Sequence, residues 1–189
     1  MTDRTLDEAR LRPPLRDGLS RRSRSVAREG LGRASAVLVP LFERDGEAHL
    51  WLVRRAKGMR DHSGQVAFPG GKHDAGDESL LATALREAEE EVALRTEDID
   101  VLGALDDLVT ITGYVITPYV GWVRAGYVPV PNAGEVDRVF AAPLRAFFEQ
   151  PSGVFPRIGW SVDGEFVWGA TAAIVRGLVA VIRETQDTQ

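Results

Sequence analysis

The sequence predicts a single domain of the α/β class, in which helices cover both faces of a β-sheet. The chain has 189 residues, enough for one domain with one core and too few to favour two. Short β-rich segments alternate with a few helical ones, with no internal repeat and no long linker. We therefore expect one layered domain over residues 34–189, preceded by an arm over residues 1–33.

The arm over residues 1–33 is rich in arginine and poor in aromatic residues. We interpret it as a partly helical or mobile leader whose charges are solvated. The alternative is an arm that helps to hold an anionic substrate or a partner subunit.

Strands are expected at residues 36–42 and 48–54, joined by a tight hairpin in which Gly46 supplies a positive φ. Further strands are expected at 101–108, 114–123 and 136–140, and Pro118 suggests an edge or a bulge in the second of these. A second hairpin should join 157–162 to 165–168 across Asp163 and Gly164. Helices are predicted at 81–92, 143–148 and 170–184.

Composition excludes several classes of function. The net charge of −5 provides no broad basic field for nucleic acid. The absence of cysteine excludes disulfides, a thiolate nucleophile and cysteine-bound zinc. No apolar run approaches the ~20 residues that cross a bilayer, and the start of the sequence lacks the apolar stretch of a signal peptide. We expect a cytoplasmic protein without nucleic-acid or membrane partners.

The predicted helix at 81–92 carries a cluster of acidic residues. At ~100° per residue, Glu87, Glu90 and Glu91 share one face, apart from the apolar face that includes Ala84 and Ala88. Like charges at this spacing repel by about 0.2–0.5 kcal/mol per pair, and the helix dipole disfavours anions at this end. A divalent cation with oxygen ligands would compensate, whereas an acidic helix end without a ligand would be a solvated face.

A glycine turn precedes this helix. Gly70 and Gly71 follow Phe68 and Pro69, and they allow backbone N–H groups to approach phosphate oxygens closely. Alone, the turn could simply connect a strand to a helix. Together with the carboxylate face it predicts a site for phosphate and metal.

The same residues resemble a known motif. Gly71, Glu78, Arg86–Glu87, Glu90–Glu91 and Leu94 are similar to the Nudix box. Two positions depart from that pattern. Six residues rather than the usual five separate Gly71 from Glu78, with Asp77 at the usual glutamate position, so either Asp77 or Glu78 could play the loop role. Ala93 replaces a common glycine, which concerns the end of the helix more than the chemistry.

Similarity extends over about residues 36–175 to the coenzyme A diphosphatase branch of that superfamily. The matching segments are 52–56, 60–65, 68–72, 83–87, 112–118, 132–135, 139–140, 143–144 and 168–172. In two of them, Gln65 and Ala56 replace the glutamate and serine that are common in the branch.

The resemblance implies a Nudix α/β/α sandwich with a mixed β-sheet and a hydrolase that uses Mg²⁺ or Mn²⁺. The implied reaction cleaves coenzyme A or acyl-coenzyme A to 3′,5′-ADP and (acyl-)4′-phosphopantetheine. One alternative is a Nudix hydrolase acting on ADP-ribose, NADH or another nucleotide. Another is a nucleotide-sensing module without catalysis, which loss of the helix carboxylates would indicate. A homodimer is suggested by analogy only.

The resemblance implies roles for individual residues. Glu87 and Glu91 are the first expected metal ligands, and Glu90 is a third ligand or the general base. Arg86 is expected in the catalytic group chiefly to orient a glutamate, and Glu135 is either a second-site ligand or base, or a surface residue. The expected substrate-binding residues are Arg54, Arg55, Arg60, His62, Gly70, Gly71 and Lys72.

Overall fold

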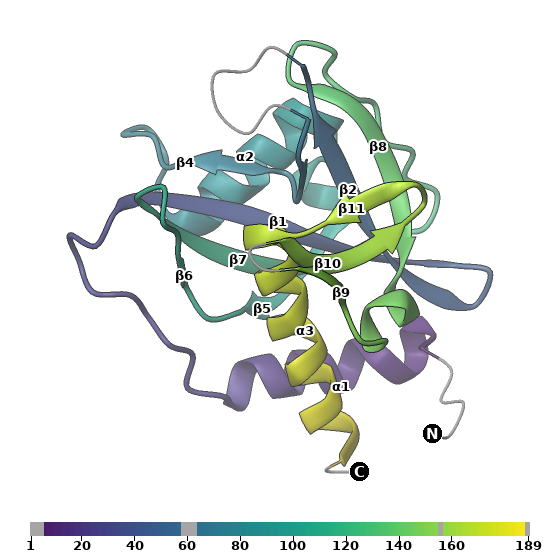
Figure 1. Cartoon of the computed structure of the whole chain (residues 1–189). Helices are drawn as coiled ribbons and strands as arrows, with labels where there is room; N and C mark the ends of the chain where they lie inside the picture. The colour runs from purple at the N-terminus through teal and green to yellow at the C-terminus, as the bar shows by residue number, and fades with distance from the viewer. Residues whose placement is uncertain (1–5, 58–63, 155–156, 188–189) are drawn as a thin grey trace.

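The computed structural model describes residues 6–57, 64–154 and 157–187. Within these ranges a central sheet lies between α2 on one face and α1 and α3 on the other (Figure 1). Two predicted substrate-binding residues, Arg60 and His62, lie outside the described residues.

The central sheet is mixed, as predicted. Its order is β3-β2-β1-β7-β5, with β4 paired to β1, β6 to β7 and β8 to β2. β1 and β7 run parallel, whereas the other pairs are antiparallel. The strands are β1 (Arg33–Arg44), β2 (Glu47–Arg55), β3 (Val66–Ala67), β4 (Gly70–Lys72), β5 (Ile99–Ala104), β6 (Leu108–Val109), β7 (Tyr114–Val123) and β8 (Val136–Pro143).

Both predicted hairpins are present. Asp45 and Gly46 connect β1 to β2 with φ of 54° and 74°, the left-handed pair that matches the twist of a two-residue hairpin. Asp163 and Gly164 do the same, with φ of 51° and 76°, between β10 (Arg157–Val162) and β11 (Glu165–Val167). A third strand, β9 (Ser152–Val154), completes this small second sheet.

The edge expected at Pro118 is a local one, a gap in the pairing on one side of β7, and not the edge of the sheet. β7 is continuous and lies inside the sheet between β1 and β5. Leu105 N–H donates to the Pro118 carbonyl at 2.9 Å. The proline nitrogen points to the same side of β7 as this carbonyl, towards the gap between the end of β5 and the start of β6. No strand of the described part of the chain pairs with Pro118 on that side, and the missing N–H therefore costs no ladder hydrogen bond. The same gap divides the strand expected at 101–108 into β5 and β6.

Helix α2 (Leu80–Val92) lies on one face of the sheet, and its Ala84, Ala88 and Val92 are buried against Ala36 and Leu38 of β1. On the other face, α3 (Gly169–Asp187) and α1 (Glu8–Arg21) share a core with the alternate residues of β1. This alternation across one strand confirms the α/β/α sandwich. Two short 3₁₀ helices, Thr96–Asp98 and Leu144–Phe148, complete the fold, and Pro143 caps the second.

Part of the arginine-rich arm forms helix α1. Leu11, Leu15 and Leu19 are buried at a four-residue spacing, which directs one face of α1 into the core. Outside that face, Arg12 and Arg16 pair with Asp100 of β5. The boundary at residue 33 stays a prediction about domain organisation. No helix among the described residues is long and apolar enough to cross a membrane.

Candidate active site

The glycine turn lies directly against helix α2. Strand β4 pairs with β1, with Gly71 opposite Ala36. A Cβ atom built on Gly71 would lie 2.4 Å from Oε1 of Glu87. Only glycine therefore lets the backbone approach this carboxylate so closely.

Glu91 is the most deeply buried acid of the site, with 1% of its surface exposed. Its Oε2 accepts a hydrogen bond from the Gly70 N–H at 3.1 Å, and its Oε1 lies 3.5 Å from Nη1 of Arg55. Burial raises the pKa of Glu91 to about 7, despite the opposing effects of Arg55 and the Gly70 N–H. The negative charges of Glu87 and Glu135 raise it further.

Glu87 shares this environment. Burial raises the pKa of its carboxyl group, the hydrogen bond and charge of Arg86 lower it, and the charges of Glu90 and Glu135 raise it. Neighbouring negative charges therefore disfavour the ionised forms of Glu87 and Glu91. This is a donor set that a hard divalent cation would stabilise.

Hydrogen bonds from Arg86 hold the acidic side chains of this site in place. Arg86 donates through Nη1 to Glu87 at 2.9 Å and to Glu90 at 3.1 Å. Among the described residues, no three histidine, aspartate or glutamate side chains lie together as a preformed set of metal ligands. Carboxylate oxygens are ligands that suit a divalent cation, and the Arg86 guanidinium balances part of their negative charge.

The loop acid that pairs with Arg86 is Asp77, not Glu78. Arg86 donates to its two carboxylate oxygens at 2.8 and 3.0 Å, and the buried Thr83 hydroxyl adds a third bond at 2.8 Å. These hydrogen bonds, that from Arg86 first, hold the pKa of Asp77 well below its usual range. Asp77 stands where the Nudix box usually has its glutamate. The supporting hydrogen bond from the Thr83 hydroxyl to Asp77 was not predicted from the sequence.

The predicted basic residues are divided between two places. Arg55 faces Glu91, and the backbone of the adjacent Ala56 donates to the Glu135 carbonyl at 2.8 Å. Arg54 instead pairs with Asp137 of β8 and Glu165 of β11, each at 2.7 Å. Successive residues of a strand point to opposite faces, so neighbours in sequence need not share a site.

Lys72 extends from β4 at the edge of the candidate site. Its ammonium nitrogen lies 5.9 Å from the ring centre of Tyr114, and the guanidinium carbon of Arg33 lies 4.8 Å from the same ring. Lys72 is exposed, as a residue that meets an anion from solvent must be. Its backbone carbonyl also accepts from Arg86 at 3.4 Å.

Comparison with known proteins decides the family. The NUDIX domain model matches residues 32–148, more than half of the chain. The chain belongs to the Nudix family. The uncharacterized Nudix hydrolase NudL of Yersinia pestis (strain Pestoides F) is 44% identical over 156 residues, covering 77% of this chain and 78% of that protein. The NudL protein of Yersinia pseudotuberculosis serotype O:1b has the same identity and coverage.

Solved structures agree with the Nudix fold. The Nudix hydrolase RenU of M. smegmatis has a TM-score of 0.58 at 19% identity, over 82% of this chain and 86% of that one. The MutT protein of Methanosarcina mazei Go1 has a TM-score of 0.56 at 19% identity, over 87% and 99% of the two chains. Nudix hydrolases cleave phosphorus-containing anhydrides in nucleotide derivatives and generally use divalent metals such as Mg²⁺ or Mn²⁺. This Nudix chain is therefore an enzyme of that class.

Proposed function

We propose that this enzyme hydrolyses the diphosphate of coenzyme A or acyl-coenzyme A, with Mg²⁺ or Mn²⁺, to 3′,5′-ADP and (acyl-)4′-phosphopantetheine. The observation that carries the diphosphatase chemistry is the buried carboxylate of Glu91, held between the Gly70 amide and Arg55 beside Glu87. The choice of coenzyme A rests on the sequence segments before and after the catalytic helix.

In this proposal Glu87 and Glu91 hold the divalent cation, and Glu90 is a third ligand or the general base. When bound, the cation supplies charge neutralisation to the phosphoryl oxygens and a more acidic water. Glu135 acts as a further ligand or base, since its charge already affects both Glu87 and Glu91. Arg86 serves to hold the carboxylates of Glu87 and Glu90 relative to Asp77.

The substrate phosphates would meet backbone and basic groups at the opposite side of these acids. The backbone at Gly70 and Gly71 would position the carboxylates of Glu91 and Glu87 that face the phosphates, and Arg55 and Lys72 would supply positive charge beside them. Arg60 and His62 belong to the same proposal on sequence grounds. Arg54 would contact substrate only after release from Asp137 and Glu165.

A substrate panel tests the assignment. With Mg²⁺ or Mn²⁺, coenzyme A should give a higher kcat/KM than dephospho-coenzyme A, because the 3′-phosphate adds a charge-assisted contact of about 1.5–3 kcal/mol. If ADP-ribose or NADH is the better substrate in the same assay, the coenzyme A assignment is wrong while the Nudix assignment stands. Binding of nucleotides without turnover would indicate a sensing module instead.

The Lys72→Met variant asks whether the basic edge contributes to this preference. We expect the ratio of kcat/KM for coenzyme A and dephospho-coenzyme A to fall towards one, because one positive charge is lost beside the site. Arg21→Met is the matched control, since Arg21 lies on α1 with 82% of its side chain exposed. An unchanged ratio in Lys72→Met would remove Lys72 from recognition of the 3′-phosphate.

The bond that breaks can be located with ¹⁸O-labelled water. Attack of water on one phosphorus should place the label in the phosphate of one product and leave the thioester of acyl-coenzyme A intact. Mass spectrometry of both products would show which phosphorus is attacked. Release of a free thiol with an uncut, unlabelled diphosphate would refute the proposed reaction.

A further inference from the structure

Thr83 is a fully buried threonine near the start of helix α2, and three polar groups surround its hydroxyl. Its Oγ1 lies 2.8 Å from Oδ2 of Asp77, 2.8 Å from Nδ1 of His73 and 3.3 Å from the Ser79 carbonyl. All three partners belong to the loop between β4 and α2. A hydroxyl has one proton and two lone pairs, so these contacts have a definite direction.

The direction follows from the state of Asp77. Its carboxylate accepts from Arg86 at 2.8 and 3.0 Å and from the Asp74 N–H at 3.1 Å. These bonds, that from Arg86 first, hold the pKa of Asp77 well below its usual range, so this side chain can only accept. The single proton of the Thr83 hydroxyl must therefore point towards Asp77. The same hydroxyl can then only accept from His73, and the Nδ1 of that ring must carry a proton.

The chain of hydrogen bonds continues to the glutamates of α2. Arg86 binds Asp77 through Nε and Nη2. Its Nη1 donates to Glu87 at 2.9 Å and to Glu90 at 3.1 Å. A guanidinium is planar, so holding one edge of it on Asp77 also sets the direction of its remaining N–H groups. The orientation of Asp77, and hence the bond that it receives from Thr83, therefore affects where these carboxylates are held.

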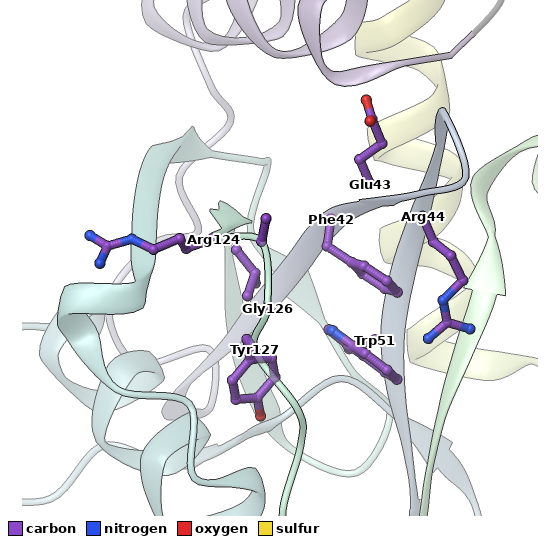
Figure 2. A pocket seen from close by; sticks show the side chains of 9 residues that line it. Phe42, Glu43, Arg44, Trp51, Arg124, Gly126 and Tyr127 are labelled. Atoms are coloured by element: carbon purple, nitrogen blue, oxygen red, sulfur yellow. The ribbon is translucent and has the colours of Figure 1, made fainter.

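The position of α2 is fixed by other contacts. Its apolar face is buried against β1, and at its far end the Tyr127 hydroxyl donates to the Val92 carbonyl at 2.6 Å. Tyr127 stands edge-on to Trp51, with ring centres 6.4 Å apart. Both rings line a small cavity beside the loop that follows β7 (Figure 2). The bond from Thr83 therefore acts on the direction of side chains and not on the place of the helix.

We propose that Thr83 is a positioning residue for the metal-binding carboxylates. Its hydroxyl accepts from the Nδ1–H of His73 and donates to Asp77, which in turn keeps the Arg86 guanidinium on the glutamates of α2. The inference rests on the proposed role of those glutamates as metal ligands, whereas the direction of the hydrogen bonds does not depend on that role. Loss of a group that orients metal ligands typically changes metal affinity or activity by roughly 10–100-fold.

The proton on His73 can be observed without metal or substrate. A long-range ¹H–¹⁵N spectrum distinguishes a ring nitrogen that carries a proton from one that does not. The spectrum of His73→Gln identifies the signals of His73 among those of the three histidines. In the neutral ring we expect the proton on Nδ1 and the lone pair on Nε2. A neutral His73 ring that carries its proton on Nε2 in the unaltered protein would overturn the proposal.

Metal binding measures the positioning itself. Electron paramagnetic resonance reports free Mn²⁺ during a titration of the protein without substrate. Thr83→Val keeps the branched shape but lacks the hydroxyl, and it should lower the Mn²⁺ affinity about tenfold or more. Thr83→Ser restores a hydroxyl and should keep most of the affinity. If Thr83→Val does not fold, Thr83→Ser and the His73 spectrum of the unaltered protein remain as tests.

Thr117→Val is the matched control. Thr117 is also fully buried, and its hydroxyl donates at 2.7 Å to Asp107, an aspartate that pairs with Arg24 of the arm. This variant should keep its Mn²⁺ affinity. Equal affinity in Thr83→Val and the unaltered protein, or an equal loss in Thr117→Val, would overturn the proposal. Absence of Mn²⁺ binding by the unaltered protein would refute the proposed metal site, and the positioning role with it.

Discussion

Glu91 combines burial with charge, and the chemistry of the site depends on that combination. Its carboxyl group is almost fully enclosed, yet it receives the Gly70 N–H and faces Arg55. Burial favours the neutral acid, whereas a bound cation requires the carboxylate. The Gly70 N–H and Arg55 therefore favour a negative charge on Glu91, but they do not fully offset the effect of burial.

The proposed metal ligands can be tested by amide substitution. Glu87→Gln and Glu91→Gln should each lower kcat at least about a hundredfold, because several kcal/mol of charge stabilisation are lost. Both variants should remain folded, since glutamine keeps the side-chain shape and removes repulsion on the helix. Glu89→Gln on the exposed face of α2 is the control, and near-normal activity in either test variant would exclude that residue from the metal site.

Removal of divalent ions provides a test without mutation. EDTA should abolish turnover, and added Mg²⁺ or Mn²⁺ should restore it, because the carboxylates of Glu87 and Glu91 cannot themselves neutralise a diphosphate. Turnover should be followed by product formation in the same sample before and after chelation. Full activity in excess EDTA would contradict the proposed metal dependence.

Gly71 is predicted to affect kcat, because its lack of a side chain leaves space for the Glu87 carboxylate. Gly71→Ala would place a Cβ within 2.4 Å of the Glu87 carboxylate, so that side chain must move. We expect kcat to fall about tenfold or more, because misplacement of a catalytic group by about 1 Å is costly. Stability should change little, since the displaced atoms end a flexible side chain. Gly76→Ala, which meets nothing within 4 Å, should keep normal kinetics.

At the scale of elements, helix α2 ends in a strained conformation. Ala93 has φ of 57°, and its N–H donates to the Glu89 carbonyl at 2.9 Å, which is the geometry that glycine usually provides at a helix end. In this left-handed region, a residue with a Cβ atom is destabilised by about 1–2 kcal/mol. The departure from the Nudix box noted at this position therefore has a conformational cost.

Ala93→Gly should stabilise the protein. Relief of strain is partly offset by the greater freedom of glycine in the unfolded chain, about 0.4–1 kcal/mol, so the net gain should be about 0.5–1 kcal/mol. Urea denaturation of the two proteins measures this difference. Ala82→Gly within the same helix should have the opposite sign, and a loss of stability in Ala93→Gly would refute the strain argument.

At the scale of the whole molecule, the arm packs on the central sheet through both apolar and ionic contacts. Asp107 is the most enclosed acid of this contact, with 6% of its side chain exposed. It accepts from Arg24 at 2.7 Å, from the Ala27 N–H at 2.9 Å and from the Thr117 hydroxyl at 2.7 Å. One carboxylate thus connects the arm to β7.

This contact should make stability sensitive to acid. Burial raises the pKa of Asp107, but the hydrogen bonds from Thr117, Ala27 and Arg24 together with the Arg24 charge lower it overall. Because the folded pKa is below the unfolded one, the stabilisation is present at neutral pH and is lost as the pH falls below about 4. The free energy of unfolding, measured in urea from neutral to acidic pH, should show this loss.

Asp107→Asn isolates the contribution. At neutral pH the variant should lose about 1–3 kcal/mol, and its stability should fall less steeply with acid than that of the unaltered protein. Asp17→Asn is the control, since Asp17 lies on the exposed side of α1. Identical acid profiles for Asp107→Asn and the unaltered protein would show that this contact does not control acid stability.

Several features could be predicted because they depend on residues close together in the chain. The Asp45–Gly46 turn requires only two left-handed residues between β-rich segments. The common face of the helix glutamates follows from 3.6 residues per turn, independently of the rest of the fold. The mixed sheet and its covering helices were predicted from the order of segments together with the Nudix resemblance.

Other features depend on contacts between distant segments. Sequence order did not show that Pro118 faces the gap between β5 and β6, or that Arg54 turns to β8 and β11 while Arg55 turns to Glu91. It left open whether Asp77 or Glu78 plays the loop role in the Nudix box, and the path of the loop brings Asp77 to Arg86.

The sequence by itself determined the segments, the acidic helix face and the glycine turn, since each is set by local dihedral preferences and short-range periodicity. Only the tertiary structure decided which carboxylate is buried and which arginine reaches it. These outcomes depend on strand register and on the exclusion of water, and both are fixed when residues such as Gly70 and Glu91, 21 positions apart, come into contact.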